Sequence, residues 1–548
     1  MAKNILFIMC DQLRFDYLGC TGHASLKTPH IDKLAQRGVR FDNAYVQSPI
    51  CGPSRMSFYT GRYVRSHGSS WNNFPLRVGE MTMGDHLRPL GMRTILCGKT
   101  HMAADYAGME RLGITTDSVI GARLAECGFE VWDRLDGLHP DGGKPPSHYN
   151  QYLNDKDYRG DNPWQDWANS AEPIDDNDND IENDKDKELL SGWLMANADK
   201  PARVGESDSE TPYITDRAME YIDQTGDENW CLHVSYIKPH WPYIVPAPYH
   251  NMYDEADVQP VVRDSIETDN PHPILAAYQL HRFSRVFSQN GVRERVIPAY
   301  MGLIKQVDDQ IGRLMAYLDD KNLTKDTLIV FTSDHGDYLG DHWLGEKEMF
   351  HQQSVKIPLI VVDPCKQADA TRGRVSETLV EAIDLLPTFV EYAGGQVAQH
   401  ILEGRSLLSQ TRAIKTASQR QYVISEYDYS MRKARSILGQ EIKDCRMIMI
   451  FDGRYKLIHV EDYRPMLFDL DTDPQEFTDL GEDAEYQNIR DILLDKIFIW
   501  SRAHHNRVTI SDEYIQNAAG KEFFKGIYIG FWDEDAVKAA NEQGEGGN

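Results

Sequence analysis

Short apolar runs alternate with segments of helical periodicity along the first 400 residues. Residues 4–10 form a nearly continuous apolar run, as in a strand buried on both faces, and residues 28–38 follow with helical spacing and a closing glycine. Apolar runs recur at residues 230–236 and 327–332, and helical spacing of apolar residues covers 300–322 between them. This alternation predicts an α/β domain built on a doubly wound sheet.

The pattern changes after about residue 415. Before it, residues 357–362 predict one more strand and residues 380–394 a helix packed on that strand. After it, residues 446–460 carry two short apolar runs about an Asp-Gly turn, which predicts a hairpin and a small antiparallel sheet. Residues 492–503 have the spacing of a helix that could cover this sheet.

These patterns divide the chain into three parts. We predict a catalytic α/β domain over residues 1–415, a small α+β subdomain over 416–508, and a C-terminal arm over 509–548 that contacts another subunit of a homo-oligomer. Residues 171–187 are acidic and almost free of apolar side chains, which indicates a solvated inserted loop. A calcium loop of the EF-hand type is excluded there, because Ile181 and Lys187 stand where glycine and glutamate are required.

Composition narrows the classes of function. The chain has 548 residues with 41% hydrophobic and 26% charged side chains, which is typical of a folded globular protein. Its formal net charge of −27 opposes binding to nucleic acid or to an anionic membrane, although a metal could still attract a small anionic substrate. The apolar run at the start is too short for an export signal, and the eight cysteines lack paired spacing. We therefore expect a cytoplasmic protein with free thiols.

Polar side chains follow two of the predicted strands directly. The first strand runs into Asp11 and Gln12, and the strand at 327–332 leads to Asp334, His335 and Asp337. Ligands of open α/β sheets bind beyond the carboxyl ends of the strands, where these side chains would form a site for calcium, magnesium or manganese. The alternative is structural, because an aspartate after a strand often caps the next helix.

Residues 48–55 (SPICGPSR) place a cysteine in a turn rich in proline and glycine. Cys51 could be a thiolate nucleophile activated by Arg55 and a helix start, or a buried inert thiol. The string C-x-P-S-R-x4-T-G from Cys51 to Gly61 resembles the motif of type I sulfatases in the alkaline phosphatase superfamily. In that family the cysteine is oxidised to Cα-formylglycine, so the resemblance implies the same fate for Cys51.

The resemblance covers about residues 3–480. Similar segments are residues 4–16 (NILFIMCDQLRFD), 28–45 (TPHIDKLAQRGVRFDNAY), 96–101 (LCGKTH), 238–243 (KPHWPY), 332–347 (TSDHGDYLGDHWLGEK) and 467–480 (LFDLDTDPQEFTDL). Asp-Gln and Asp-His at the metal positions, together with residues 236–253 (YIKPHWPYIVPAPYHNMY), look closest to the branch with arylsulfatases, choline-sulfatases and phosphonate monoester hydrolases. The resemblance implies an alkaline-phosphatase-like fold: a mixed, mostly parallel sheet between helices, followed by a smaller antiparallel sheet.

Carried over position by position, the resemblance implies a set of roles. Metal ligands would be Asp11, Gln12, Cys51, Asp334 and His335. Catalytic groups would be Cys51, Arg55, Lys99, His101, His240 and Lys347, and Asn72 would contact substrate together with Lys99, His240 and Lys347. Implied cofactors are one divalent metal, calcium or manganese, and formylglycine at Cys51. Implied partners are a small anionic ester and the formylglycine-generating enzyme.

The implied reaction is hydrolysis of sulfate monoesters. A hydroxyl of the metal-bound formylglycine hydrate attacks sulfur, His240 or Lys347 protonates the leaving oxygen, and His101 takes a proton as the ester intermediate collapses. Lys99 and His101 favour sulfate, since the aligned residues of phosphonate monoester hydrolases tend to be Tyr and Thr. Hydrolysis of phosphonate monoesters or phosphodiesters, with promiscuous sulfatase activity, is the alternative. A metal-binding or interaction protein with unmodified Cys51, or a cysteine hydrolase, would be the non-sulfatase alternatives.

Overall fold

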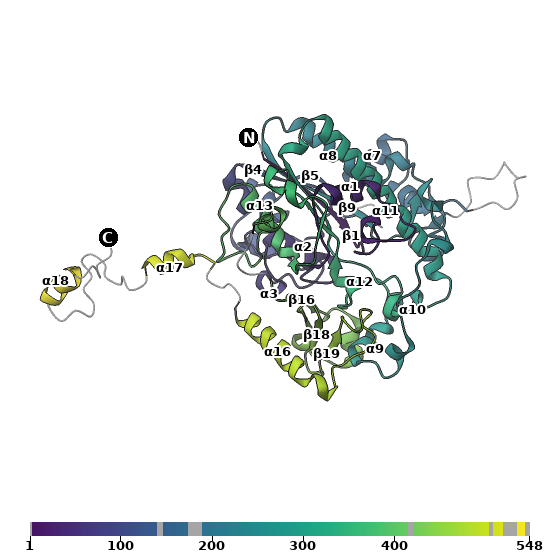
Figure 1. The fold of residues 1–548 in the computed structure, drawn as a ribbon. Coiled ribbons are helices and arrows are strands. Elements are labelled where there is room, and N and C mark those ends of the chain that lie inside the picture. Colours follow the sequence, from purple (N-terminus) through teal and green to yellow (C-terminus); the bar gives the residue numbers. More distant parts are fainter. Residues whose placement is uncertain are drawn as a thin grey trace, which may run out of the picture.

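The computed structural model describes residues 3–139, 146–173, 189–414, 420–503, 508–518 and 534–542. Its centre is an eight-stranded sheet in the order β14-β2-β13-β11-β1-β9-β4-β5 (Figure 1). The strands of this sheet are β1 (Asn4–Asp11), β2 (Val39–Phe41), β4 (Met92–Gly98), β5 (Glu130–Arg134), β9 (Asn229–Pro239), β11 (Thr327–Ser333), β13 (Leu359–Val362) and β14 (Arg374–Ser376).

The five strands β11, β1, β9, β4 and β5 run parallel, and they carry the site at their carboxyl ends. Asn4 of β1 pairs with Thr327 of β11, and Cys10 pairs with Ser333, so both strands end at the same edge. β13 is antiparallel to β11, and β2 is antiparallel to β13. The expected mixed, mostly parallel α/β sheet is confirmed, with its antiparallel pairings on the β11 side.

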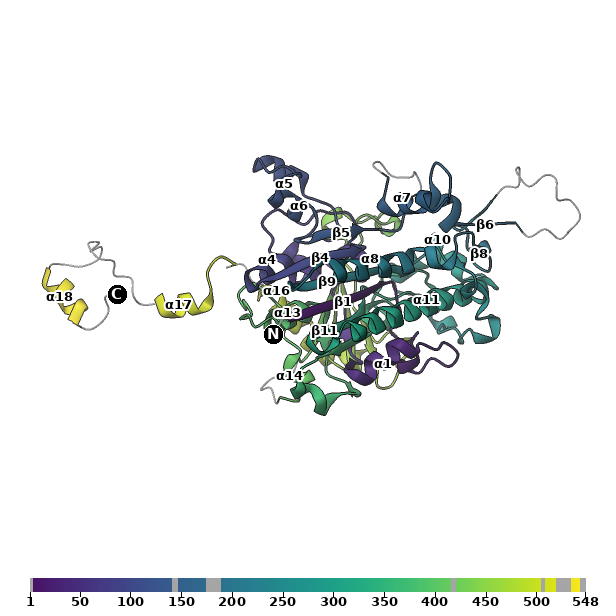
Figure 2. The same ribbon diagram turned by 90° about the horizontal axis from the view of Figure 1, so that it is seen from above.

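Two layers of helices cover the sheet because β1 alternates between two cores. Leu6 and Ile8 face a core shared with α1 (Pro29–Arg37), α8 (Glu210–Gln224) and α11 (Val292–Asp320). Figure 2 shows these helices along one face of the sheet. Phe7 and Met9 face the other core, shared with α2 (Cys51–Thr60), α4 (Met83–Leu87) and α13 (Leu385–Tyr392). A strand buried on both faces must be apolar at successive positions, as β1 is from Ile5 to Cys10.

A second, antiparallel sheet follows near the C-terminus. It has the order β16-β17-β18-β19, with β16 (Val423–Asp428), β17 (Arg446–Phe451), β18 (Tyr455–Val460) and β19 (Met466–Asp469). β17 and β18 form the predicted hairpin. The helix α16 (Gln487–Arg502) covers one face with Leu493, Ile497 and Trp500, and the other face joins the core that contains Phe7.

Two predicted elements were wrong in detail. The predicted strand at 357–362 is split at Pro358 into β12 (Lys356–Ile357), which pairs with β3 (Ala44–Tyr45), and β13 in the large sheet. The predicted helix at 380–394 starts as the strand β15 (Val380–Glu381), and α13 begins only at Leu385. Short apolar segments fit a strand and a buried helix equally well, which explains the second error.

Several expectations lie beyond what is described. Most of the predicted acidic loop at 171–187 falls outside the described residues, which resume at 189, after the gap at 174–188. Parts of the arm are described as α17 (Asp512–Ala518) and α18 (Glu534–Glu542). The domain boundaries, the oligomer and the cytoplasmic location stay predictions. None of the helices in the described ranges combines the length and apolar character needed to cross a bilayer.

Candidate active site

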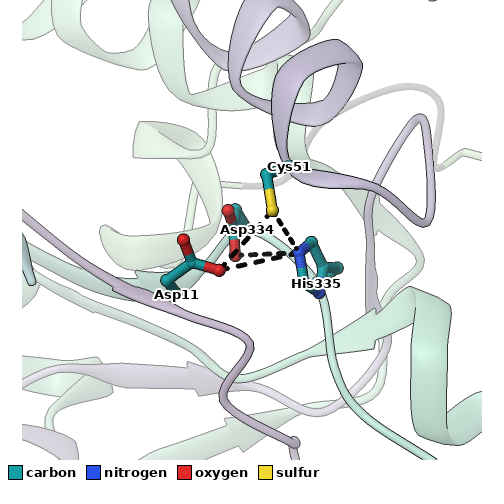
Figure 3. A group of neighbouring side chains, drawn as sticks. All are labelled: Asp11, Cys51, Asp334 and His335. Carbon is teal, nitrogen blue, oxygen red and sulfur yellow. Dashed lines mark hydrogen bonds and ion pairs between the residues drawn. The ribbon is translucent and has the colours of Figure 1, made fainter. Parts of the chain in front are cut away.

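Four predicted ligands converge at the carboxyl edge of the parallel strands. Asp11 ends β1, Asp334 and His335 follow β11, and Cys51 begins α2 (Figure 3). One potential ligand atom from each lies within 4.8 Å of the others, and all four side chains are fully buried. Cys51 Sγ is 3.0 Å from His335 Nε2 and 3.7 Å from Asp11 Oδ1.

The donor chemistry of this cluster fits a divalent cation. His335 Nδ1 donates to the carbonyl oxygen of Gly336 over 2.9 Å, which leaves the lone pair on Nε2, the atom that faces the carboxylates. Nε2 lies 3.7 Å from both Asp11 Oδ1 and Asp334 Oδ1. Two carboxylates and an imidazole are ordinary ligands of calcium and manganese, so the residues present suit the metal that the resemblance implies.

Gln12 lies beside this cluster with both ends of its amide engaged. Its Nε2 donates to Asp337 Oδ2, and its Oε1 accepts a hydrogen bond from Lys347 Nζ over 3.1 Å. Its backbone nitrogen donates to Asp334 Oδ1 over 3.0 Å, with Gln12 at a φ of 65°. The role of Gln12 as a metal ligand therefore stays a prediction. What the structure shows is that its side chain links Asp337 to Lys347.

Arg55 holds the two carboxylates together from the second turn of α2. Its Nε lies 2.8 Å from Asp334 Oδ2, and its Nη2 lies 3.4 Å from Asp11 Oδ2. Its Nη1 donates to the carbonyl oxygen of Lys99 and to Ser235 Oγ, over 2.9 and 2.8 Å. The guanidinium is completely buried, and charge-assisted hydrogen bonds on several sides compensate for its desolvation.

Lys99 reaches the site because β4 ends in a glycine. Gly98 has a φ of +111°, and a Cβ there would lie 2.1 Å from the carbonyl oxygen of Ser235. The chain can thus approach β9 closely, and Lys99 N donates to the same oxygen over 3.1 Å. Lys99 Nζ forms a buried ion pair with Asp11 Oδ2. Burial would raise the pKa of Asp11, but Lys99 and Arg55 hold it below its usual range.

Lys347 and His240 also lie close to Cys51. Lys347 Nζ donates to Cys51 Sγ over 3.2 Å and lies 3.4 Å from His240 Nε2. His240 Nδ1 donates to the carbonyl oxygen of Trp241 over 2.6 Å. Burial would raise the pKa of the Cys51 thiol, but Lys347 and His335 lower it well below its usual range. Burial also lowers the pKa of His240.

The two remaining predicted residues lie at the rim. Both His101 and Asn72 are half-buried. Asn72 Oδ1 accepts a hydrogen bond from Gly52 N over 2.7 Å, so it engages the backbone beside Cys51. His101 has a φ of 51°, its backbone nitrogen donates to Asp136 Oδ1, and its side chain lowers the pKa of Cys51.

Three further groups support the site: Asp337, which the sequence placed with the expected metal ligands, and Tyr243 and Ser235, to which the sequence assigned no role. Asp337 accepts hydrogen bonds from Gln12 Nε2 and, over 2.7 Å, from Tyr243 OH; burial raises its pKa to about 6. Ser235 supplies both a hydroxyl to Arg55 and a carbonyl to Lys99. Their one common signal is position, because each lies at the carboxyl end of a central strand or just after it.

Comparison of the sequence with known proteins gives matches over most of the chain. The sequence profile described as "Sulfatase" matches residues 3–395, and one described as "N-sulphoglucosamine sulphohydrolase, C-terminal" matches residues 340–502. The multifunctional alkaline phosphatase superfamily protein PehA of Trinickia caryophylli is 31% identical over 92% of this chain and 96% of its own. An arylsulfatase of Clostridium perfringens is 26% identical over 90% and 93%.

Solved structures with the same fold include two phosphonate monoester hydrolases. The enzyme from Silicibacter pomeroyi superposes with a TM-score of 0.77 at 27% identity, covering 93% of this chain and 98% of its own. The enzyme from Agrobacterium radiobacter gives a TM-score of 0.76 at 27% identity, covering 92% and 96%.

Proposed function

Since the chain belongs to the sulfatase family and hydrolyses sulfate monoesters, we propose that it does so at Cys51, on aryl or small alkyl sulfates. The observation that carries this proposal is the position of Cys51. Its sulfur lies 3.0 Å from His335 Nε2, an expected metal ligand, and 3.2 Å from Lys347 Nζ, a cation. A nucleophile at this position would be activated by both the metal and the lysine.

The family implies a divalent metal and formylglycine, and the residues present can hold both. We propose Asp11, Asp334 and His335 as ligands of calcium or manganese, together with Gln12 and the modified side chain of Cys51. When bound, the cation lowers the pKa of the nucleophilic hydroxyl of formylglycine and offsets negative charge as the reaction proceeds.

The neighbouring side chains bind and orient the ester. Lys99 Nζ pairs with Asp11 and Lys347 Nζ donates to Cys51 Sγ, so both lysines would contact the sulfate oxygens on which charge develops. Arg55 keeps both carboxylates in place, and Asn72 holds the backbone at Gly52 while its amide nitrogen contacts substrate.

His240, Lys347 and His101 would carry out the two proton transfers. His240 Nδ1 carries a proton that is fixed on a carbonyl, so Nε2 faces Lys347 Nζ. A proton supplied by Lys347, directly or through His240 Nε2, would reach the leaving oxygen. His101 lies near enough to Cys51 to lower the pKa of that thiol, and from there it can accept the proton released when the enzyme–sulfate ester breaks down.

A second candidate function is hydrolysis of phosphonate monoesters or phosphodiesters. It is favoured by the likeness to two phosphonate monoester hydrolases over 93% and 92% of the chain. Sulfur and phosphorus oxyanions have similar shape, so activity on both substrate classes is expected. Lys99 and His101 are the two residues that favour sulfate as the better substrate.

The test compares 4-nitrophenyl sulfate, the 4-nitrophenyl ester of phenylphosphonate and bis(4-nitrophenyl) phosphate on one preparation. Conversion of Cys51 is first quantified from the mass of its tryptic peptide, so that each rate refers to converted enzyme. We expect the highest kcat/KM for the sulfate. A much higher value for the phosphonate would reassign the preferred substrate, and a wholly unmodified thiol in active protein would rule out formylglycine.

The proposal includes partners as well as substrate. Formation of the aldehyde at Cys51 requires a formylglycine-generating enzyme, which would act on the segment from Cys51 to Gly61. The arm over residues 509–548 is our candidate for contact between subunits of a homo-oligomer.

A further inference from the structure

A large cavity lies behind the histidine that faces Cys51. Its volume is about 870 Å³, and its walls include Trp193, Trp241, Tyr243 and Phe283. Trp241 lies within 6.2 Å of Phe283 and 5.9 Å of Trp193, measured between ring centroids. We call this cavity, defined by these four rings together with Arg282 and Arg295, the Trp241 pocket.

The loops that form the pocket also carry the groups at the leaving oxygen. The ring of Trp241 stacks on His240 with a centroid distance of 4.7 Å, and its Nε1 donates to Glu346 Oε1 over 3.2 Å. Glu346 directly precedes Lys347. Gly345 contacts the helix α10 (Arg282–Phe287), because a Cβ there would lie 2.7 Å from the backbone of Phe283. Movement of a pocket wall would therefore displace His240 or Lys347.

The charge of the pocket is opposite to that of the chain. Arg282 and Arg295 line it, and its lining contains no aspartate or glutamate among the described residues. The whole chain has 85 acidic against 58 basic residues. Arg295 Nη1 donates to the carbonyl oxygen of Ala196 over 3.0 Å, and the Arg282 guanidinium lies 4.8 Å from the ring centroid of Phe283. Aromatic walls with two arginines suit a flat, apolar group that carries a negative charge.

The direction of the reaction gives such a group a place. In an in-line displacement the leaving oxygen departs on the side opposite the nucleophile. Lys347 Nζ lies 3.2 Å from Cys51 Sγ and 3.4 Å from His240 Nε2, so both Lys347 and His240 are close to the reacting group. An alcohol that leaves past Lys347 and His240 would meet Trp241, whose ring stacks on His240.

We propose that the Trp241 pocket binds the alcohol part of the substrate, and that this alcohol is aromatic and carries a second anionic group such as a carboxylate. This inference rests on the proposed hydrolysis of sulfate esters and specifies their class. Trp241 and Phe283 contact the ring system, and Arg282 and Arg295 bind the anionic substituent.

The kinetic test uses the sulfate esters of 6-hydroxy-2-naphthoate and 6-hydroxy-2-naphthamide, which differ in charge but hardly in shape. We expect kcat/KM to be at least tenfold higher for the carboxylate. Arg282→Gln and Arg295→Gln should each reduce this ratio about tenfold, mainly through KM. Arg285→Gln is the matched control, because Arg285 is exposed on the same helix and is not a lining residue. Equal rates for the two esters, or an equal loss with Arg285→Gln, would overturn the proposal.

A binding measurement separates this proposal from the proposed function. Calorimetry with 6-hydroxy-2-naphthoate on the Cys51→Ala protein needs no catalysis, and Trp193→Ala in that background should weaken binding at least tenfold. Binding without hydrolysis of any sulfate ester would support the pocket and contradict the proposed function. Hydrolysis of sulfate esters without binding of the naphthoate would contradict the pocket alone.

Discussion

Asp337 shows how a residue outside the cluster of Asp11, Cys51, Asp334 and His335 can affect the geometry of the site, because it holds Gln12 beside that cluster. It is fully buried and accepts hydrogen bonds from Gln12 Nε2, Tyr243 OH and Leu339 N. Asp337→Asn would turn an amide donor towards at least one of these donors. We expect metal affinity or kcat to fall about 10- to 100-fold, as for other groups that orient a metal site. Calcium titration by calorimetry and steady-state kinetics measure the two effects.

The control for Asp337 is Tyr243→Phe, which removes one donor and leaves the carboxylate in place. Its effect should be several-fold smaller than that of Asp337→Asn. If the two variants were equally impaired, the tyrosine and not the link to Gln12 would account for the loss.

His233 makes stability depend on pH from inside the sheet. Its ring stacks on Phe7 at 4.4 Å, its Nδ1 donates to the Phe7 carbonyl, and its Nε2 accepts from Tyr59 OH. Burial lowers its pKa to about 3. Because the unfolded chain takes up this proton near pH 6.5, the contribution of His233 is complete above that pH and is lost as pH falls towards 3.

The change in stability with pH can be assigned to His233 by substitution. Between about pH 6.5 and 3, each unit of pH should lower the free energy of unfolding by about 1.4 kcal/mol on account of this residue. Urea unfolding at pH 7.5 and 5.5 should show a smaller loss for His233→Gln than for the unchanged protein. An identical loss in both would assign the pH dependence to other groups.

The candidate metal ligands could be predicted from the sequence because carboxylate and imidazole side chains come directly after the predicted strands. Asp11 and Asp334 come immediately after apolar runs, and the motif around Cys51 has fixed spacing. The contacts of Ser235 and Asp337 could not be predicted in this way. A serine at the end of a strand has no distinctive pattern, and its bond to Arg55 joins positions 180 residues apart.

At the scale of elements, the end of β4 depends on Gly98. Both its φ of +111° and the 2.1 Å approach of a Cβ to Ser235 O disfavour a side chain. Gly98→Ala should destabilise the protein by about 1–3 kcal/mol and displace Lys99, lowering kcat/KM at least tenfold. Thermal or urea unfolding and kinetics on the same preparation test this.

Gly91 provides the comparison for Gly98 at the other end of the strand. It has a φ of +75°, and a Cβ there would meet no atom within 4 Å. Gly91→Ala should cost about 1 kcal/mol through backbone strain alone and leave kcat/KM unchanged. A similar loss of activity in both variants would mean that backbone strain, and not the close approach of Gly98 to Ser235, accounts for the loss at Gly98.

The elements that could be predicted from the sequence are those whose apolar pattern has a clear beginning and end. The strand β1 and the hairpin of β17 and β18 were predicted correctly. β1 is an apolar run of strand length that ends at Asp11, and an Asp-Gly turn joins the two apolar runs of the hairpin. The split at Pro358 and the reversed direction of β13 could not be predicted from periodicity. Neither the partner of a strand nor its direction is encoded in the spacing of its own apolar residues.

Across the whole molecule, the small sheet is joined to the catalytic region by a buried ion pair. Lys456 Nζ lies 2.6 Å from Glu476 Oε1 and donates to the carbonyl oxygen of Phe350 over 2.9 Å. Glu476 also accepts from Gln352 N, so both partners contact the segment just after Lys347. The two regions share one hydrophobic core, which predicts a single unfolding transition.

Removal of one partner tests this connection. Lys456→Met leaves the Glu476 carboxylate buried and unpaired, which should lower the free energy of unfolding by about 3–5 kcal/mol. Unfolding followed by tryptophan fluorescence and by circular dichroism should shift together. Two separate transitions would show that the C-terminal sheet unfolds independently.

The pairing of β1 with β11 delays the burial of Cys51 while the chain is being synthesised. Cys51 and His335 are 284 positions apart, and the sulfur becomes enclosed only when both have arrived. At 5–20 residues per second, the ribosome takes about 15–60 s to cover that interval. Until then the Cys51 thiol is accessible on an incomplete chain, so any enzyme that alters this sulfur acts on a polypeptide that is still being made or has not yet closed.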